Sequence, residues 1–336
     1  MICIFSSPVD VSTIDVMQWL SYLGMKDVIR INYNDNHTSL LVNIEKNDFY
    51  FQLDGQLIYL KNIEAVWYRK GKNWLCDQFF PITGGEHTKF ISHLNYRLQS
   101  EEAKLSEYLH HIIENSVPVV LGSNAKSDLN KLLTLHAAEE SGLLVPDFFV
   151  SNNKEGLKNI FSRYPDLITK SLSEGLFLFE KEESQLGYFS YTEKVSTGIL
   201  KLLPEKISPS FLQKNIHKKY ELRVFFLENT CYSMVIFSQN DVQTQVDFRK
   251  YNEEAPNRCV PFLLPVEIDT KIKLLFKKLC LNTGSVDLLV DKKGNFYFLE
   301  INPVGQFGMV SEPCNYYLEK KIALYLMQNE TRKSKA

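Results

Sequence analysis

Residues 284–303 read GSVDLLVDKKGNFYFLEINP, and this stretch predicts two strands joined by a tight polar turn. Apolar runs flank the turn, and a strand places successive side chains on opposite faces, so Glu300 and Asn302 share one face. Folding the hairpin about Lys293 brings Asp287 roughly opposite Glu300. Two carboxylates and one amide carbonyl then converge, which is the oxygen ligand set that a hard cation such as Mg²⁺ prefers.

The alternative interpretation is a polar strand edge whose acids are solvated, which is the usual situation of a single Asp or Glu. Here two acids and an amide lie within otherwise apolar strands, where burying unpaired charge is costly. The pattern therefore favours a metal site.

The same hairpin carries a resemblance to a known family. Asp287, followed by LEINP at 299–303, resembles the metal-binding end of the ATP-grasp ligases. The continuation PVGQFG at 303–308 narrows the resemblance to ATP-grasp peptide maturases of the graspetide, or microviridin, type and, within that type, to the grasp-with-spasm maturases. The resemblance extends over most of the chain.

For the fold, the resemblance implies an α/β (α+β) protein with the ATP-grasp fold. Two lobes would enclose ATP, and a pre-ATP-grasp-like α/β domain would precede them. The expected bounds are 1–122 for the N-terminal domain, 123–217 for the central lobe, 218–330 for the C-terminal lobe and 331–336 for a disordered tail.

Bulk composition narrows the class of protein. The 336 residues suffice for two or three domains, and a net charge of −2, from 38 basic and 40 acidic residues, argues against nucleic acid as a main partner. The six cysteines form no CxxC pair, which is typical of reduced cysteines in a cytoplasmic protein and favours neither zinc nor disulfides. We find no signal peptide and no membrane-spanning stretch, so we expect a cytoplasmic protein without a membrane partner.

Hydrophobic periodicity and turn signals predict the individual elements. Strands are expected at 1–6, 28–31, 39–44, 48–53, 56–60, 117–122, 145–150, 166–170, 187–192, 220–226 and 231–237. Helices are expected at 13–23, 88–115, 128–142, 153–164, 270–281 and 313–327. Ser127 and Asp128 can cap the helix at 128–142, and Gly142 can end it.

Two lysines are candidates for binding the nucleotide phosphates. The resemblance implies that Lys131 points to the phosphates, although such a residue is more often a surface lysine. Lys170 closes an apolar strand, so it can aim a fixed charge at the adenine and α-phosphate side of a nucleotide. The Ser/Gly loop that follows could lie over the phosphates, but its single glycine excludes a P-loop.

Further nucleotide contacts are implied by the family resemblance. The segment that resembles the interlobe hinge would read the adenine edge through main-chain groups, and its positions are Gln213, Lys214, Asn215 and Ile216. Glu221 would hold the ribose hydroxyls, and Arg223 would face the γ-phosphate and the acyl group. Glu221 and Arg223 share a strand face opposite Leu222, Val224 and Phe226, a pattern that a half-solvated strand explains equally well.

Other basic residues complete the candidate set. Asp247-Phe248-Arg249 resembles the Asp-aromatic-Arg element of these maturases, which makes Arg249 a second candidate, beside Arg223, for contacting the reacting carboxylate. The strand ending in Tyr68-Arg69-Lys70 either presents a basic residue from the N-terminal domain, as in the family, or is a solvated strand end.

The function that the resemblance implies is an ATP-dependent, ADP-forming ligase using ATP and Mg²⁺. It would activate Asp or Glu side chains of a ribosomal precursor peptide, leader plus core, as acyl phosphates and join them to Thr or Ser hydroxyls or Lys amines. Two alternatives stay open: an ATP-grasp ligase acting on a small molecule or a protein terminus, and a peptide-binding module without turnover. Similar maturases are often dimers, so the resemblance also points to a homodimer.

Overall fold

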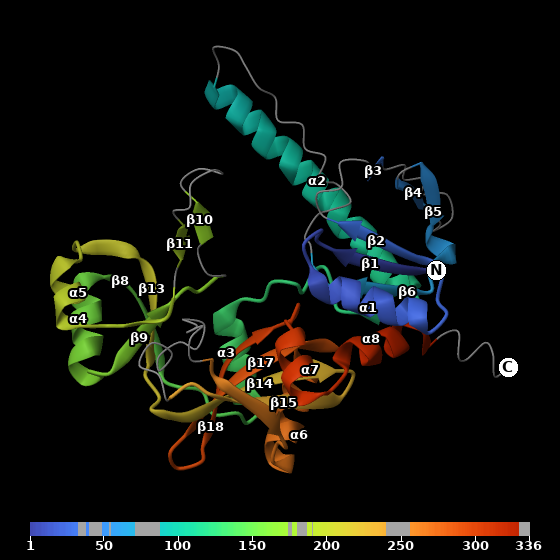
Figure 1. Ribbon diagram of the computed structural model, residues 1–336. Coiled ribbons are helices and arrows are strands. Elements are labelled where there is room, and N and C mark those ends of the chain that lie inside the picture. Colours follow the sequence, from blue (N-terminus) through green and yellow to red (C-terminus); the bar gives the residue numbers. More distant parts are fainter. Residues whose placement is uncertain are drawn as a thin grey trace. The chain divides into compact units, whose positions relative to one another are not determined.

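The computed structural model describes residues 1–32, 38–39, 49–53, 55–70, 88–173, 177–179, 187–189, 191–239 and 256–328 (Figure 1). The chain forms two compact units. The first comprises Met1–Asp128, Leu281–Gly284 and Pro303–Ala336, and the second comprises Leu129–Cys280 and Ser285–Asn302. The division into three parts stays a prediction, and the predicted tail lies outside the described residues. None of the described helices has the length and apolar character needed to cross a membrane.

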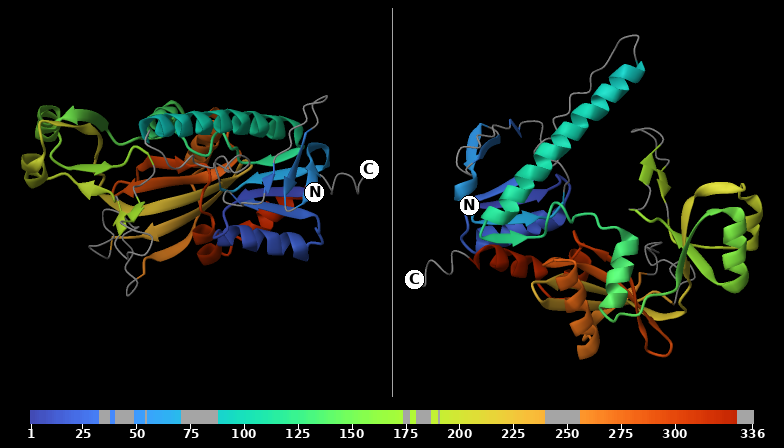
Figure 2. Two further views of the ribbon diagram at one scale, coloured as in Figure 1. Left: turned by 90° about the horizontal axis from the view of Figure 1, so that it is seen from above. Right: turned by 180° about the vertical axis from the view of Figure 1, so that it is seen from behind.

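The first unit is built on a parallel sheet. Its strand order is β2 (Val28–Asn32), β1 (Ile2–Ser6), β6 (Ala65–Tyr68) and β7 (Val119–Leu121). Helix α2 (Thr88–Ser116) lies on one face and α1 (Val11–Tyr22) on the other (Figure 2, left). On the α2 face, Leu109 and Ile113 pack with Phe5, whereas on the α1 face the hydroxyls of Ser6 and Thr13 are 2.6 Å apart. Such two-sided cover explains why β1 is buried throughout.

Arg69, at the end of β6, is not a solvated strand end. Its side chain is 3% exposed, with Nε 3.3 Å from an Asp10 carboxylate oxygen. Its guanidinium also donates to the carbonyl of Val304 at 2.5 Å and lies over the ring of Phe307. Arg69 therefore fixes the loop after Pro303 within the first unit, and the solvated interpretation is wrong.

One sheet of the second unit is antiparallel. Its order is β12 (Glu193–Lys194), β9 (Leu167–Lys170), β13 (Lys206–Lys214) and β8 (Phe148–Asn153). Helices α4 (Lys154–Arg163) and α5 (Thr197–Leu202) cover one face, and a buried cluster joins them to the sheet. Its core is Leu157, Leu167, Leu200 and Leu212. The opposite face of this sheet lines the pocket described below.

The other large sheet of the second unit has five strands. Its order is β16 (Arg258–Phe262), β15 (Thr230–Phe237), β14 (Lys218–Leu227), β17 (Thr283–Asp291) and β18 (Phe296–Asn302). Helix α6 (Val266–Lys278) packs on one face, where the rings of Phe226 and Phe276 stack with centroids 3.9 Å apart.

The remaining elements are β3 (Thr38–Ser39), β4 (Tyr50–Leu53), β5 (Gln56–Tyr59), η1 (Leu60–Asn62), α3 (Lys131–Glu140), β10 (Phe177–Phe179), β11 (Gly187–Phe189) and α7 (Gly308–Cys314).

Three predicted helices have wrong boundaries. Helix α6 covers Val266–Lys278 rather than 270–281. The closing helix at 313–327 is split into α7 and α8 (Leu318–Leu326), because Asn315 and Tyr317 both adopt the left-handed conformation at φ 52°. Helix α3 begins at Lys131, and its cap is Asn130 rather than Ser127 or Asp128.

Removing this cap gives a small, measurable loss of stability. The Asn130 side chain accepts the backbone N–H groups of Leu132 and Leu133 at 2.9 and 3.2 Å. We expect Asn130→Ala to cost about 1 kcal/mol and to lower the melting temperature by about 2–3 °C. Asn159→Ala, an exposed change inside α4, is the control and should produce no such loss. Equal melting curves for the two variants would contradict the assignment of the cap.

Candidate functional site

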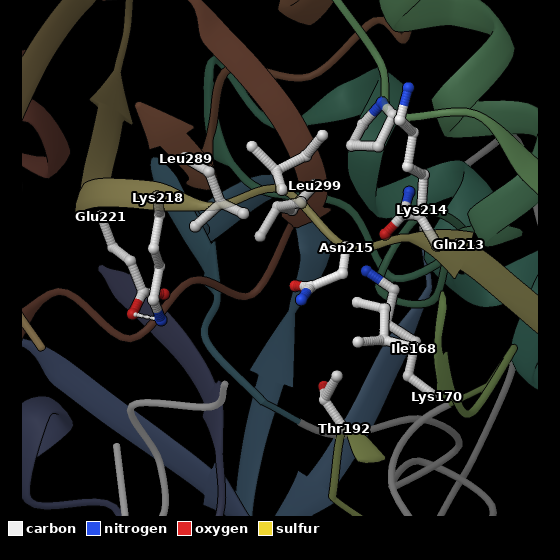
Figure 3. A pocket seen from close by; sticks show the side chains of 12 residues that line it. Ile168, Lys170, Thr192, Gln213, Lys214, Asn215, Lys218, Glu221, Leu289 and Leu299 are labelled. Carbon is white, nitrogen blue, oxygen red and sulfur yellow. Dashed lines mark hydrogen bonds and ion pairs between the residues drawn. The ribbon is translucent and has the colours of Figure 1, made fainter. Parts of the chain in front are cut away.

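A pocket in the second unit brings together all the predicted nucleotide-binding residues except Lys131 (Figure 3). Its lining comprises Pro146, Ile168, Lys170, Thr192, Gln213, Lys214, Asn215, Ile216, Lys218, Glu221, Leu289 and Leu299. The lining combines apolar side chains with fixed charges of both signs. That composition suits a ligand with a flat apolar part and a charged part.

The hinge segment is held in place by neighbouring loops. The backbone N–H of Lys214 donates to the carbonyl of Asp147 at 2.8 Å, and that of Asn215 donates to the carbonyl of Asp166 at 3.0 Å. The Asn215 amide also donates to the Asp166 carboxylate at 3.0 Å. Two of the main-chain donors that were expected to face a nucleobase are therefore engaged within the protein.

Glu221 belongs to a buried polar group that includes an unpredicted residue. The Lys218 ammonium lies 2.5 Å from a Glu221 carboxylate oxygen (Figure 3). The Ser238 hydroxyl donates to the same oxygen at 2.6 Å. Burial raises the pKa of Glu221, and the ammonium of Lys218 opposes that rise. Lys218 was missed because it lies three residues before Glu221, a spacing that in a regular strand puts side chains on opposite faces.

The hairpin of β17 and β18 contains the predicted cluster of oxygen ligands. Asp287 pairs directly with Glu300, as predicted, and Asn302 pairs with Ser285. The register shifts between Asp287 and Leu288, because Leu299 is an extra residue in β18 with no partner in β17. Without this bulge, the register nearer the turn would place Glu300 opposite Val286, on the other face. The bulge thus determines that both carboxylates share one face.

Each acid of the pair has a cationic neighbour. The Arg223 Nη1 lies 2.7 and 2.8 Å from the two carboxylate oxygens of Asp287, and the Lys131 ammonium lies 3.9 Å from Glu300. Lys131 also donates to the backbone carbonyl of Ser171, at the start of the Ser/Gly loop, at 2.5 Å. Its side chain is only 14% exposed, so it is not a surface lysine. Lys131 therefore joins the Ser/Gly loop to the acidic pair.

The donor set fits a hard divalent cation. The described residues contain no group of three His, Cys, Asp or Glu side chains placed to hold a metal. Two carboxylates and an exposed amide are nevertheless a suitable partial set for Mg²⁺, which commonly takes its other ligands from phosphates and water. Arg249, the second predicted contact to the carboxylate, lies outside the described residues.

Comparisons with known proteins show which solved structures the whole chain resembles. No protein-family model and no curated protein matches the chain. A RiPP-associated ATP-grasp ligase of Chryseobacterium gregarium, in complex with ADP and a leader and core peptide, matches with a TM-score of 0.77 at 23% identity. The match covers 99% of this chain and 96% of the ligase.

Two further solved structures match along almost their full length. Macrocyclase MdnC of Microcystis aeruginosa MRC, bound with precursor peptide MdnA, has a TM-score of 0.74 at 25% identity, with 98% of this chain and 100% of MdnC covered. The ATP-grasp ligase PsnB, complexed with a phosphomimetic variant of a minimal precursor, Mg and ADP, has a TM-score of 0.71 at 19% identity, with 97% of each chain covered.

These matches confirm the predicted fold and the resemblance from which it was inferred. The parallel first unit, the antiparallel sheet with its hinge and the five-stranded sheet with its acidic hairpin all belong to the matched length. The chain therefore has the ATP-grasp fold over almost the whole of the given sequence.

Proposed function

We propose that this protein is an ATP-dependent ligase that macrocyclises a ribosomally made precursor peptide. It joins Asp or Glu side chains to Thr or Ser hydroxyls, giving esters, or to Lys amines, giving amides. The observation that carries the proposal is the pairing of Asp287 with Glu300 beside Lys131 and Arg223, in the same unit as the pocket that contains Lys170. Likeness to a macrocyclase bound with its precursor supports a peptide as the substrate.

The reaction proceeds in two steps. A substrate carboxylate oxygen attacks the γ-phosphorus of ATP, which forms an acyl phosphate and releases ADP. The hydroxyl or neutral amine then attacks the acyl carbon, the bond from that carbon to the phosphate oxygen breaks, and inorganic phosphate leaves carrying the proton that the nucleophile loses. One ATP is therefore converted to ADP and phosphate for each bond, and the peptide loses the elements of one water. Catalysis of this kind is chiefly alignment and neutralisation of charge.

The predicted metal ligands and the two lysines would neutralise the charge of the phosphates. Asp287, Glu300 and Asn302 would hold Mg²⁺, which would offset the negative charge of the nucleotide phosphates. Lys131, next to Glu300, and Lys170, in the pocket, supply further positive charge to the phosphates. The Ser/Gly loop is tied to this site through Ser171.

We assign Arg223 a role at both the metal site and the acyl group. Its Nη1 binds Asp287, while its Nε is buried and has no hydrogen-bond partner in the described part of the chain. A buried N–H without an acceptor is costly, and a substrate carboxylate or its acyl phosphate would satisfy it. We assign Arg249 the same substrate group, and Glu221 the ribose hydroxyls.

The proposal also covers the cellular location of the protein and its oligomeric state. Precursor, comprising leader and core, and enzyme would meet in the cytoplasm, where ATP is abundant and cysteines stay reduced. The active species would be a homodimer, which sedimentation of the purified protein tests.

Release of ADP separates this function from its alternatives. The adjoining reading frames should include a short one rich in Thr, Ser, Asp, Glu and Lys, and the peptide it encodes is the probe. ADP release that requires this peptide supports the maturase. Release only with free amino acids or other small carboxylates favours the small-molecule ligase, and no release with either substrate favours a binding module.

A further inference from the structure

Gln213 is a fully buried amide with no hydrogen-bond partner among the described residues. Its exposure is 0%, and neither its side-chain oxygen nor its side-chain nitrogen has a hydrogen-bond partner among the residues that the structure describes. A buried amide normally forms hydrogen bonds, because leaving it unpaired in an apolar setting costs free energy. The buried Gln213 amide therefore requires either a ligand that pairs with it or a structural reason for being unpaired.

The register of β13 shows which way this side chain faces. Leu212 packs into the cluster beneath α4 and α5, so Gln213, the next residue, faces away from those helices. Gln213 pairs with Ile168, and Phe211 pairs with Lys170. Ile168, Lys170 and Gln213 all line the pocket and lie along the same wall of it (Figure 3). The unpartnered amide thus belongs to the pocket face of the sheet.

We propose that the Gln213 side chain selects adenine by reading its N6/N7 edge. The side-chain oxygen accepts from the N6 amino group, and the side-chain nitrogen donates to N7. This inference rests on the proposed function in taking the pocket as the nucleotide site. Adenine presents a donor beside an acceptor on that edge, which an amide matches, whereas guanine presents two acceptors. Because the backbone N–H groups of Lys214 and Asn215 are already engaged, a side-chain reader supplements the hinge main chain.

Nucleotide binding without peptide tests the inference directly. Calorimetry on the full-length protein with Mg²⁺ should show ADP binding about 10-fold more tightly than 7-deaza-ADP, in which a C–H replaces N7. GDP should bind more weakly still. Equal affinity of the native protein for ADP and 7-deaza-ADP would overturn the proposal, whatever the behaviour of any variant.

Gln213→Met is the informative variant because it keeps the side-chain length and removes both polar groups. We expect it to bind ADP about 10-fold less tightly than the native protein and to lose the preference over 7-deaza-ADP. Lys206→Met, an exposed change in the same strand, is the control and should keep the preference. A Gln213→Met protein that still prefers ADP would overturn the inference.

Thermal stability distinguishes this role from a structural one. Without nucleotide, Gln213→Met should melt at the same temperature as the native protein or about 2 °C higher, because an unpaired buried amide is removed. A lower melting temperature would reveal a structural partner and contradict the inference. The inference can fail while the proposed function holds. A native protein without base selectivity but with peptide-dependent ADP release would contradict only the role of Gln213. A native protein that binds no nucleotide would contradict both proposals.

Discussion

Glu300→Gln should abolish peptide-dependent ADP release and leave the fold intact. The change removes one negative ligand from a dication, and the remaining donors hold metal-bound nucleotide too loosely for reaction. Glu300 is 35% exposed, and its ammonium neighbour Lys131 is 3.9 Å away, so the neutral amide is tolerated structurally. Steady-state ADP release should fall by at least about 1,000-fold, as expected for loss of preorganised charge at the reacting phosphate. The melting temperature should stay within about 1 °C of the native value.

Asp287→Asn should abolish turnover as well, but with a loss of stability. Both carboxylate oxygens of Asp287 contact Nη1 of Arg223, whose side chain is 10% exposed, and neutralising Asp287 leaves a nearly buried guanidinium without its anion. Breaking such a pair costs roughly 3 kcal/mol. Thermal unfolding of the two variants therefore separates them. Normal ADP release in either variant would mean that the hairpin is merely structural.

Arg223→Lys should lower kcat by on the order of 100- to 1,000-fold and raise the KM for ATP much less. A guanidinium spans both oxygens of a carboxylate or an acyl phosphate, whereas an ammonium cannot. Such contacts strengthen as charge develops on the reacting centre, so the loss appears in the chemical step. Initial-rate measurements over a range of ATP and peptide concentrations give both constants, and Arg249→Lys is the parallel variant.

A structural role for the arginines would give a different pattern. If Arg223 only anchors Asp287, its Lys variant loses thermal stability and ATP affinity together, while kcat per folded molecule is preserved. That outcome for both Arg223 and Arg249 would remove them from the catalytic assignment. It would leave the activated carboxylate without an assigned partner.

The acidic hairpin shows which features of the site can be predicted from the sequence and which cannot. Apolar runs around the polar turn predict two strands, and alternation predicts that Glu300 and Asn302 share a face. The pairing of Asp287 with Glu300 depends also on the bulge at Leu299, which has no glycine or other local signal in the sequence. The prediction named the right pair, but the structural reason for it became visible only in the register.

Elements fixed by tertiary contacts were less predictable. The left-handed residues Asn315 and Tyr317 interrupt an apolar periodicity that continues on both sides, so a single closing helix was predicted. No spacing rule predicts the ion pair of Lys218 with Glu221, or the Gln213 amide that has no partner among the described residues. All three residues line one pocket. Local sequence patterns therefore predict strand pairing better than they predict the partners of buried polar side chains.

The central claim is that this chain forms side-chain ester or amide bonds in a peptide at the expense of ATP. The most direct test is the intact mass of the precursor peptide after incubation with the enzyme, ATP and Mg²⁺, with the Glu300→Gln variant in parallel. The native enzyme should produce peptide lighter by one water for each bond, with one ADP released per water lost, and the variant should leave the mass unchanged. Peptide of unchanged mass in the presence of peptide-dependent ADP release, or water loss that is equal with both proteins, would contradict the account.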